Sequence, residues 1–137
     1  MARNIKYIVI HCTAGPQNQT TSAIKNWWKT GLGWKSPGYH LLISADGSYE
    51  RLAKDEEICN GVSGQNKHSI HISYKGGVDA NGKALDNRTE AQKKTLVTLI
   101  KTMKAKYPNA RVVGHRDFQG VKKDCPSFNA MKEYEGI

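Results

Sequence analysis

The segment Asn4-Ile-Lys-Tyr-Ile-Val-Ile-His-Cys12 runs directly into the turn sequence Thr-Ala-Gly-Pro, and it sets the architecture of the whole chain. Its second half is rich in β-branched and aromatic residues, which favour strands, whereas Gly-Pro favours a turn. The apolar run is almost continuous, which is typical of a central strand covered on both faces. We therefore predict a strand over 4–12 in the middle of a sheet.

Beyond this strand, helical and strand patterns alternate along the chain. Apolar residues recur three and four positions apart in the helices, and β-branched residues dominate the strands between turn signals. The expected elements are, in order, a helix over 20–29, a hairpin with strands over 39–44 and 48–52, a strand over 69–75, a helix over 89–106, a strand over 111–114, and a helix that Ser127 caps and that ends near 134. This order predicts an α/β domain with a central mixed β-sheet flanked by helices.

Local signals support several of these assignments. Asp-Gly at 46–47 supplies the positive φ of a tight hairpin turn, and Thr89 with Gln92 fits a helix capping box. Residues 69–75 alternate between apolar and polar, which predicts a half-buried strand. The polar, glycine-bearing residues 53–67 predict a long surface loop.

Length and charge narrow the class of protein. The chain has 137 residues and a mass of 15.2 kDa, which suits one domain spanning residues 1–137. Its 21 Lys and Arg against 12 Asp and Glu give a formal charge of +9, which favours an anionic partner such as nucleic acid, a membrane surface or acidic cell-wall polymer. No helix-turn-helix or zinc-finger pattern accompanies the charge, so we expect no specific nucleic-acid binding.

Apolar runs and cysteine content bear on the cellular setting. The longest apolar run near the start, residues 8–10, is far shorter than a membrane span or the core of a signal peptide. We therefore expect no membrane insertion, and synthesis in the cytoplasm without a signal peptide. The three cysteines, Cys12, Cys59 and Cys125, are sparse and odd in number, so we expect no disulfide framework.

Candidate metal ligands lie where strands give way to loops. His11 ends the first strand, where open α/β sheets place ligand crevices, and the neighbouring Cys12 must face the opposite side of the sheet. His115 follows an apolar run at 112–114, and Cys125 comes ten residues later. Two imidazoles and one thiolate would leave the fourth position of zinc to water, as in catalytic sites. A hydrogen-bonded structural ring is the alternative interpretation of His11.

The same segments carry a family resemblance. Ile8-Val-Ile-His-Cys-Thr-Ala14, Gly38-Tyr-His-Leu-Leu-Ile43 with Asp-Gly at 46–47, Gly114-His-Arg-Asp117 and Lys123-Asp-Cys-Pro-Ser-Phe128 occur in this order. Together they resemble the zinc-dependent N-acetylmuramoyl-L-alanine amidases, and within them the small phage lysozyme-type amidases, which are related to peptidoglycan recognition proteins. The resemblance covers nearly the whole chain and implies the fold of that family.

The resemblance implies zinc-dependent hydrolysis of the amide bond between N-acetylmuramic acid and L-alanine in bacterial peptidoglycan. It implies that His11, His115 and Cys125 bind Zn²⁺, and that Tyr39 and Lys123 are the catalytic side chains. Zinc can polarise the scissile carbonyl, while a phenol and an ammonium can orient water and stabilise the developing oxyanion. Without the resemblance, Tyr39 and Lys123 would be interpreted as a sheet-edge aromatic and a solvated surface charge.

Two positions depart from the family pattern. His71 stands where relatives commonly carry glycine, and residues 61–64, Gly-Val-Ser-Gly, stand where many carry a histidine or tryptophan that lines the substrate groove. These departures leave the specificity for the stem peptide open. His40 follows Tyr39 on the same strand and must face the other way, so we interpret it as structural.

Three tryptophans precede the hairpin. Trp27 and Trp28 are neighbours on the expected helix, so we predict that one lies in the core and the other is partly exposed. Trp34 lies in the following loop, where it either packs against the domain or stacks on sugar at the edge of the groove.

Other functions fit parts of the sequence. A non-catalytic peptidoglycan-binding module is the main alternative, but such members of the wider family typically lack the cysteine ligand, so Cys125 favours the enzyme. A basic zinc nuclease would need a general-base constellation that the sequence does not offer. We expect a monomer that acts at the bacterial cell wall, to which its positive charge attracts it.

Overall fold

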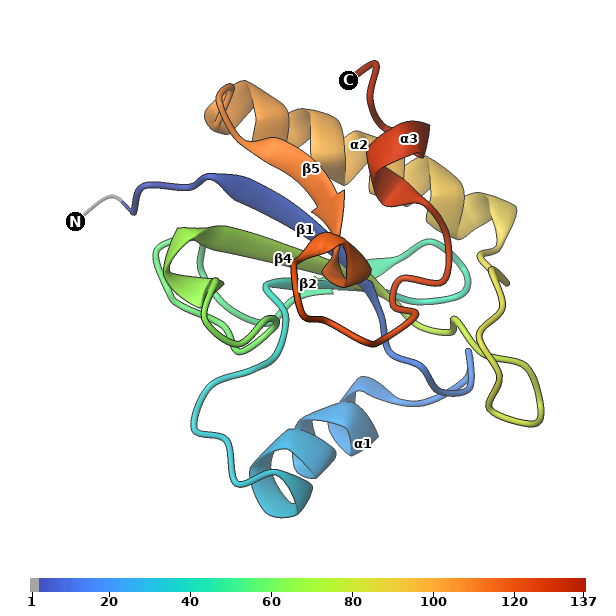
Figure 1. The fold of residues 1–137 in the computed structure, drawn as a ribbon. Coiled ribbons are helices and arrows are strands. Elements are labelled where there is room, and N and C mark those ends of the chain that lie inside the picture. Colours follow the sequence, from blue (N-terminus) through green and yellow to red (C-terminus); the bar gives the residue numbers. More distant parts are fainter. Residues whose placement is uncertain (1–2) are drawn as a thin grey trace.

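A five-stranded sheet runs through the middle of the protein, with helices on both of its faces (Figure 1). The computed structural model describes residues 3–137. The strands are β1 (Tyr7–Cys12), β2 (Leu41–Ile43), β3 (Tyr49–Arg51), β4 (Ser69–Tyr74) and β5 (Arg111–Gly114). Their spatial order is β3-β2-β4-β1-β5, and β3 alone runs antiparallel to its neighbour. The predicted α/β class and mixed sheet are therefore confirmed, with β1 in an interior position.

The helices occur where the apolar spacing predicts them. They are α1 (Thr21–Asn26), continued by a π-helical turn over Trp27–Gly31, α2 (Glu90–Lys106) and α3 (Ala130–Glu133). The capping box of Thr89 and Gln92 is present at the start of α2. No helix within the described residues is long and apolar enough to cross a membrane.

The predicted cap of the last helix is wrong. The Asn129 side chain, rather than that of Ser127, accepts the hydrogen bond from the Lys132 amide at the start of α3. Ser127 has a positive φ of 70°, and its hydroxyl donates to the Gly77 carbonyl oxygen at 2.7 Å. Ser127 therefore fastens the preceding loop to the sheet edge instead of starting the helix.

The two faces of the sheet have different chemistry because successive strand residues point to opposite sides. One face carries the isoleucines of β1 and β4, which share a large apolar core with α2 and α3. Burying each such side chain stabilises the fold by about 1.5–3 kcal/mol. The other face carries His11, Ser69, His71 and Ser73, and all four of these polar side chains are buried.

The expectation of a half-buried β4 is therefore wrong. All six of its residues are buried, because β4 lies between β1 and β2 and its polar face is covered as well. The covering segment is the loop over 53–67, in which Val62 packs against Val9 and Val113. The sequence pattern predicts this loop on the surface, yet Cys59 within it is fully buried. The loop thus packs over the polar face of the sheet.

A buried arginine joins the segment before α2 to α3. The Arg88 side chain is 2% exposed, and its guanidinium donates to the carboxylates of Asp86 and Glu133 at 2.6–2.9 Å. It also lies 3.4 Å from the centre of the Phe128 ring and donates to the Tyr134 hydroxyl. Its hydrogen bonds hold the pKa of Asp86 and of Glu133 below their ordinary values.

Replacing Arg88 with methionine should lower the free energy of unfolding by about 2–3 kcal/mol at neutral pH, because two partly exposed carboxylates lose a buried partner. A carboxyl with a depressed pKa contributes stability above its unfolded pKa and loses it as the pH falls through its folded pKa. The difference between wild type and variant should therefore shrink below about pH 4. Urea unfolding across this range measures it.

The matched control is Lys93→Met, since Lys93 forms an exposed pair with Glu90 and such pairs contribute at most about 1 kcal/mol. An Arg88→Met deficit that stays the same in acid as at neutral pH would contradict the ion-pair role and leave only lost packing.

Candidate metal centre

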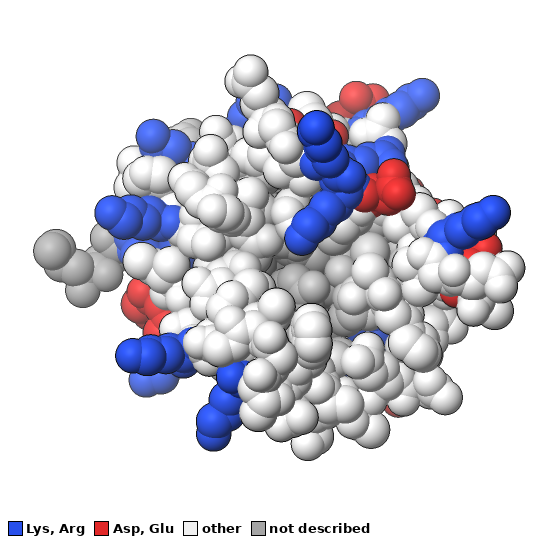
Figure 2. Space-filling model, turned by 60° about the horizontal axis from the view of Figure 1, so that its bottom comes forward, with Lys and Arg blue, Asp and Glu red and all other residues white. Residues whose placement is uncertain are grey.

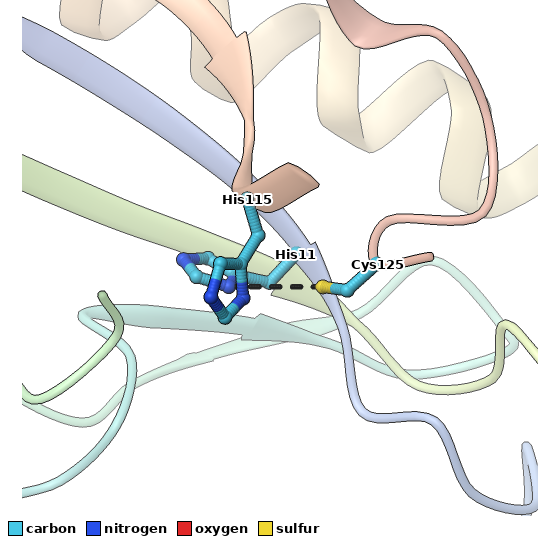
Figure 3. Close-up of side chains that lie close together, drawn as sticks. All are labelled: His11, His115 and Cys125. Atoms are coloured by element: carbon cyan, nitrogen blue, oxygen red, sulfur yellow. Dashed lines mark hydrogen bonds between the residues drawn. The ribbon is translucent and has the colours of Figure 1, made fainter. Parts of the chain in front are cut away.

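Two imidazoles and one thiol from three parts of the chain meet at the carboxyl edge of the sheet (Figure 3). His11 is the penultimate residue of β1, His115 begins the 3-10 turn after β5, and Cys125 lies in the loop before α3. One donor atom from each of these side chains lies within 4.8 Å of the other two. Residues far apart in sequence thus form a compact donor set of the kind that binds a metal ion.

The sheet places the two histidines together. β1 and β5 are parallel with Ile10 opposite Gly114, so the next residue of each segment lies at the same level: His11 within β1, and His115 at the start of the turn that follows β5. The Asp117 carboxylate accepts a hydrogen bond from the Gly114 amide at 2.6 Å and closes the turn that carries His115. Strand register and a local cap therefore position both rings.

The thiol is held by the backbone of the first strand. The Cys12 amide donates to the Cys125 sulfur at 3.1 Å, and the Arg116 amide donates to the Cys125 carbonyl oxygen at 2.9 Å. The Cys125 sulfur lies 3.8 Å from Nδ1 of His11. With tetrahedral zinc bonds of about 2.3 Å to sulfur and 2.1 Å to nitrogen, this separation would be about 3.6 Å, so the donor spacing suits zinc.

Burial keeps both candidate imidazoles neutral. It lowers the pKa of His11 well below its ordinary value, and the nearby His71, His115 and Lys123 lower it further. Burial and Lys123 also lower the pKa of His115, to about 4. Neutral imidazole is the form that offers a lone pair to a metal. The site therefore presents nitrogen donors across the neutral pH range.

Contact between Cys12 and Cys125 shifts the pKa values of their thiols in opposite directions, down for Cys12 and up for Cys125. Contact with Cys12 raises the pKa of the Cys125 thiol, and burial raises it further, so without a cation this sulfur keeps its proton. A coordinated cation reverses this balance, since it deprotonates a thiol that binds it. Cys12 itself is buried in the apolar core, on the opposite face of the sheet from His11, as predicted.

Tyr39 and Lys123 line the same cavity as the three candidate ligands, a space of about 160 Å³. The Tyr39 hydroxyl donates to the Cys12 carbonyl oxygen at 3.2 Å, and its ring centre lies 5.0 Å from that of His11. Burial raises the pKa of Tyr39, so the phenol keeps its proton and remains a donor. The Lys123 side chain is exposed at the rim. Tyr39 and Lys123 thus both border the cavity that holds the donor set.

Aromatic side chains and open grooves extend the cavity. Trp28 and Trp34 stack with ring centres 6.5 Å apart, and both line the cavity. Trp28 is 7% exposed and Trp27 57%, which confirms the expected division between core and surface. A neighbouring groove of about 590 Å³ shares Trp34 and Lys123 with the cavity. Figure 2 shows one face of the molecule with a hollow near its middle and Lys and Arg side chains around it.

A second layer of polar residues lies behind the donor set, and sequence reasoning missed its role. His71 of β4 contacts His11 through a hydrogen bond of 2.8 Å between ring nitrogens, and Asn66 contacts His71 at 2.9 Å. The alternation of β4 places His71 on the polar face, but the pairing of β4 with β1 cannot be read from that pattern. His40 lies outside the cavity, where it accepts from the His71 amide, in agreement with a structural role.

Comparisons with known proteins agree with this geometry. The family model described as N-acetylmuramoyl-L-alanine amidase matches residues 1–128. The endolysin of Escherichia phage T7 is 34% identical over 130 residues, which cover 93% of this chain and 84% of the endolysin.

Solved structures show the same likeness. The N-acetylmuramoyl-L-alanine amidase LysC from Clostridium intestinale URNW superimposes with a TM-score of 0.80 and 26% identity, covering 96% of this chain and 82% of LysC. Bumblebee PGRP-SA superimposes with a TM-score of 0.77 and covers 97% of this chain and 81% of its own; at 22% identity it shows a common fold.

Proposed function

The chain belongs to the N-acetylmuramoyl-L-alanine amidase family, and from this premise we propose that it works with a zinc ion held by His11, His115 and Cys125. It is an amide hydrolase of bacterial peptidoglycan and cleaves the bond between N-acetylmuramic acid and L-alanine. The observation that carries the zinc proposal is the close approach of two neutral imidazoles and one thiol, with donor atoms within 4.8 Å of one another.

The donor set suits zinc better than harder cations. Imidazole nitrogen and thiolate sulfur are ligands that zinc prefers, whereas magnesium and calcium prefer oxygen. Three protein donors leave one position open, which distinguishes a catalytic from a structural zinc site. When bound, zinc would supply the Lewis acidity that polarises the scissile carbonyl and makes water more acidic.

Tyr39 and Lys123 provide the other catalytic groups in this proposal. The Tyr39 hydroxyl keeps its proton because burial raises its pKa. When substrate binds, this hydrogen turns from the Cys12 carbonyl oxygen to the substrate carbonyl oxygen, where it stabilises the negative charge that develops. Trp28 packs edge-on against the Tyr39 ring at 5.3 Å and holds its orientation. Lys123 brings a positive charge to the rim of the same cavity, where it stabilises that oxygen and attracts stem-peptide carboxylates.

The cellular role follows from substrate and charge. We propose one catalytic domain over residues 1–137 that acts as a monomer on the bacterial cell wall, as the name endolysin of its phage T7 relative suggests. The formal charge of +9 attracts the protein to this anionic polymer. The alternative of a non-catalytic binding module is disfavoured, because the matching family and LysC are both named amidases.

Digestion of purified peptidoglycan should release new amino groups of alanine without new reducing sugar ends. A zinc chelator should stop the release, and added zinc should restore it, because the donor set needs a cation to act on the amide. Mass analysis of the fragments identifies the bond. New reducing ends would indicate a glycosidase, and undiminished activity in excess chelator would contradict the metal proposal.

Replacing Cys125 with serine should remove most of the bound zinc and reduce turnover by more than the roughly 10–100-fold typical of losing an outer partner of a metal ligand. Metal analysis of the purified protein and the fragment assay measure the two effects. Cys59→Ala is the control, because Cys59 is a buried cysteine of the loop over 53–67 that does not line the cavity. If the serine variant kept both zinc and turnover, Cys125 would not be a ligand.

Tyr39→Phe and Lys123→Met should each lower kcat by about 10²–10³-fold, the effect of losing one stabiliser of a developing oxyanion. Bound zinc should stay near the wild-type level in both, since neither side chain belongs to the donor set. The controls are Tyr49→Phe on β3 and Lys94→Met on α2, both exposed. A wild-type kcat in either active-site variant would remove that residue from the mechanism.

A further inference from the structure

The imidazole of His71 lies at the centre of the polar face of the sheet and joins the candidate metal centre to the loop above it. Its side chain is fully buried. Its Nδ1 lies 2.8 Å from Nε2 of His11, and its Nε2 lies 2.9 Å from Oδ1 of Asn66. These contacts form a continuous row from the loop to the first candidate ligand.

The hydrogen bond between the Val62 amide and Asn66, at the loop end of this row, fixes the direction of every other hydrogen bond in it. The Val62 backbone amide donates to Oδ1 of Asn66 at 2.8 Å, so the atom at that position must be the amide oxygen and not its nitrogen. The same oxygen accepts from His71, whose Nε2 therefore carries the hydrogen. In a neutral imidazole the other nitrogen is then an acceptor. Nδ1 of His71 must therefore accept from Nε2–H of His11.

This direction determines which nitrogen of His11 is free. Because Nε2 of His11 carries the hydrogen, its Nδ1 holds the lone pair. Nδ1 is also the nitrogen that faces Cys125, with 3.8 Å between nitrogen and sulfur (Figure 3). The hydrogen-bonded row thus turns the donor atom of His11 toward the rest of the donor set.

The His71 ring fits in its position because the residue beside it in the loop, Gly61, has no side chain. A Cβ atom on Gly61 would lie 2.3 Å from Nδ1 of His71, so a larger residue at this position would force the ring or the loop to shift. Gly61 itself lines the cavity of the candidate metal centre. The glycine and the histidine, which depart from the family pattern at separate points of the sequence, therefore form one arrangement in space.

The backbone behind the ring is also fixed. The His71 amide donates to Nδ1 of His40 at 3.0 Å, so Nε2 of the neutral His40 ring carries the hydrogen and donates it to the Glu57 carbonyl oxygen at 2.8 Å. The His40 and His71 rings stack with centres 5.9 Å apart. His71 is thus held by its main chain, by ring stacking and by both ring nitrogens.

We propose that Asn66 and His71 form a hydrogen-bonded relay that selects the tautomer of His11 and presents its Nδ1 to the metal. His71 is then a positioning residue, which acts on the metal through His11. The proposal rests on the assignment of His11 as a zinc ligand. It adds a specific role for a residue that the family resemblance marks only as a departure.

The tautomers test the relay directly. Histidine ¹⁵N NMR on the full-length wild type, with and without zinc, should show hydrogen on Nε2 of both His11 and His71 at neutral pH. The zinc-loaded protein should in addition show Nδ1 of His11 as the coordinated nitrogen. Hydrogen on Nδ1 of His11 in the zinc-free protein would overturn the relay. This measurement needs no variant, so it holds even where a substitution in the core prevents folding.

Zinc affinity of variants, measured by competition with a chromophoric chelator, supplies the second test. His71→Phe keeps a ring in the space but offers no acceptor, so it should bind zinc about 10–100-fold more weakly. His71→Asn places an oxygen at the position of Nδ1 and should recover most of that loss. Gly61→Ala should weaken binding as His71→Phe does, because its Cβ displaces the ring.

The matched controls are His68→Phe and Gly136→Ala. His68 contacts the Asn4 carbonyl outside the row, and a Cβ on Gly136 would meet nothing within 4 Å. Unchanged zinc affinity in a folded His71→Phe protein would overturn the proposal. Equal losses of zinc affinity in the His71→Phe and His71→Asn variants would also overturn it, because they would indicate that His71 acts through packing alone. If the zinc-loaded wild type shows no coordinated nitrogen on His11, the assignment of His11 as a ligand fails instead. The tautomers of the zinc-free protein still test the relay in that case.

Discussion

Parallel pairing of β1 with β4 on one side and with β5 on the other is the constraint on which the site depends. Because the strands run in the same direction, their carboxyl ends meet at one edge of the sheet. His11 and His115 therefore come together although most of the chain separates them. The Cys12 amide at the end of β1 then orients the Cys125 sulfur, so one strand end supplies the first donor and positions the third.

The same sheet separates a dry apolar face from a buried polar one. Burying imidazoles without partners would cost several kcal/mol of stability. Within residues 3–137 no buried side-chain nitrogen or oxygen lacks a hydrogen-bond partner, so this cost is offset. Burial also keeps the His11 and His71 rings neutral, which is the state that a metal centre needs. Burial with complete hydrogen bonding thus has two effects: it keeps the polar face stable, and it keeps the imidazoles in the neutral form that binds a cation.

Charge acts at two ranges in this protein. Over long distances the formal charge of +9 favours the approach of an anionic polymer. Within the cavity, Lys123 adds to the effect of burial in lowering the pKa of His115. The positive rim therefore supports both the encounter with the wall and the protonation state of a candidate ligand.

Local backbone preferences made much of the architecture predictable. The β-branched run of β1, the Asp-Gly hairpin turn and the capping box of α2 are each set by neighbouring residues, and the ordered motifs around His11, His115 and Cys125 placed the chain in its family. The prediction that Ser127 caps the last helix is wrong, because Asn129, two residues later, caps α3 instead.

Other features follow only from contacts between distant residues. Alternation in β4 indicates which side chains share a face, but strand order and register are set by long-range pairing. That pairing puts His71 beside His11, and the packing of the loop over 53–67 buries a face that the sequence pattern left exposed. The sequence alone thus determined the elements, the family and the candidate ligands. The tertiary structure decided which polar residues stand behind those ligands, because a buried hydrogen-bonded row exists only once strand and loop have packed together.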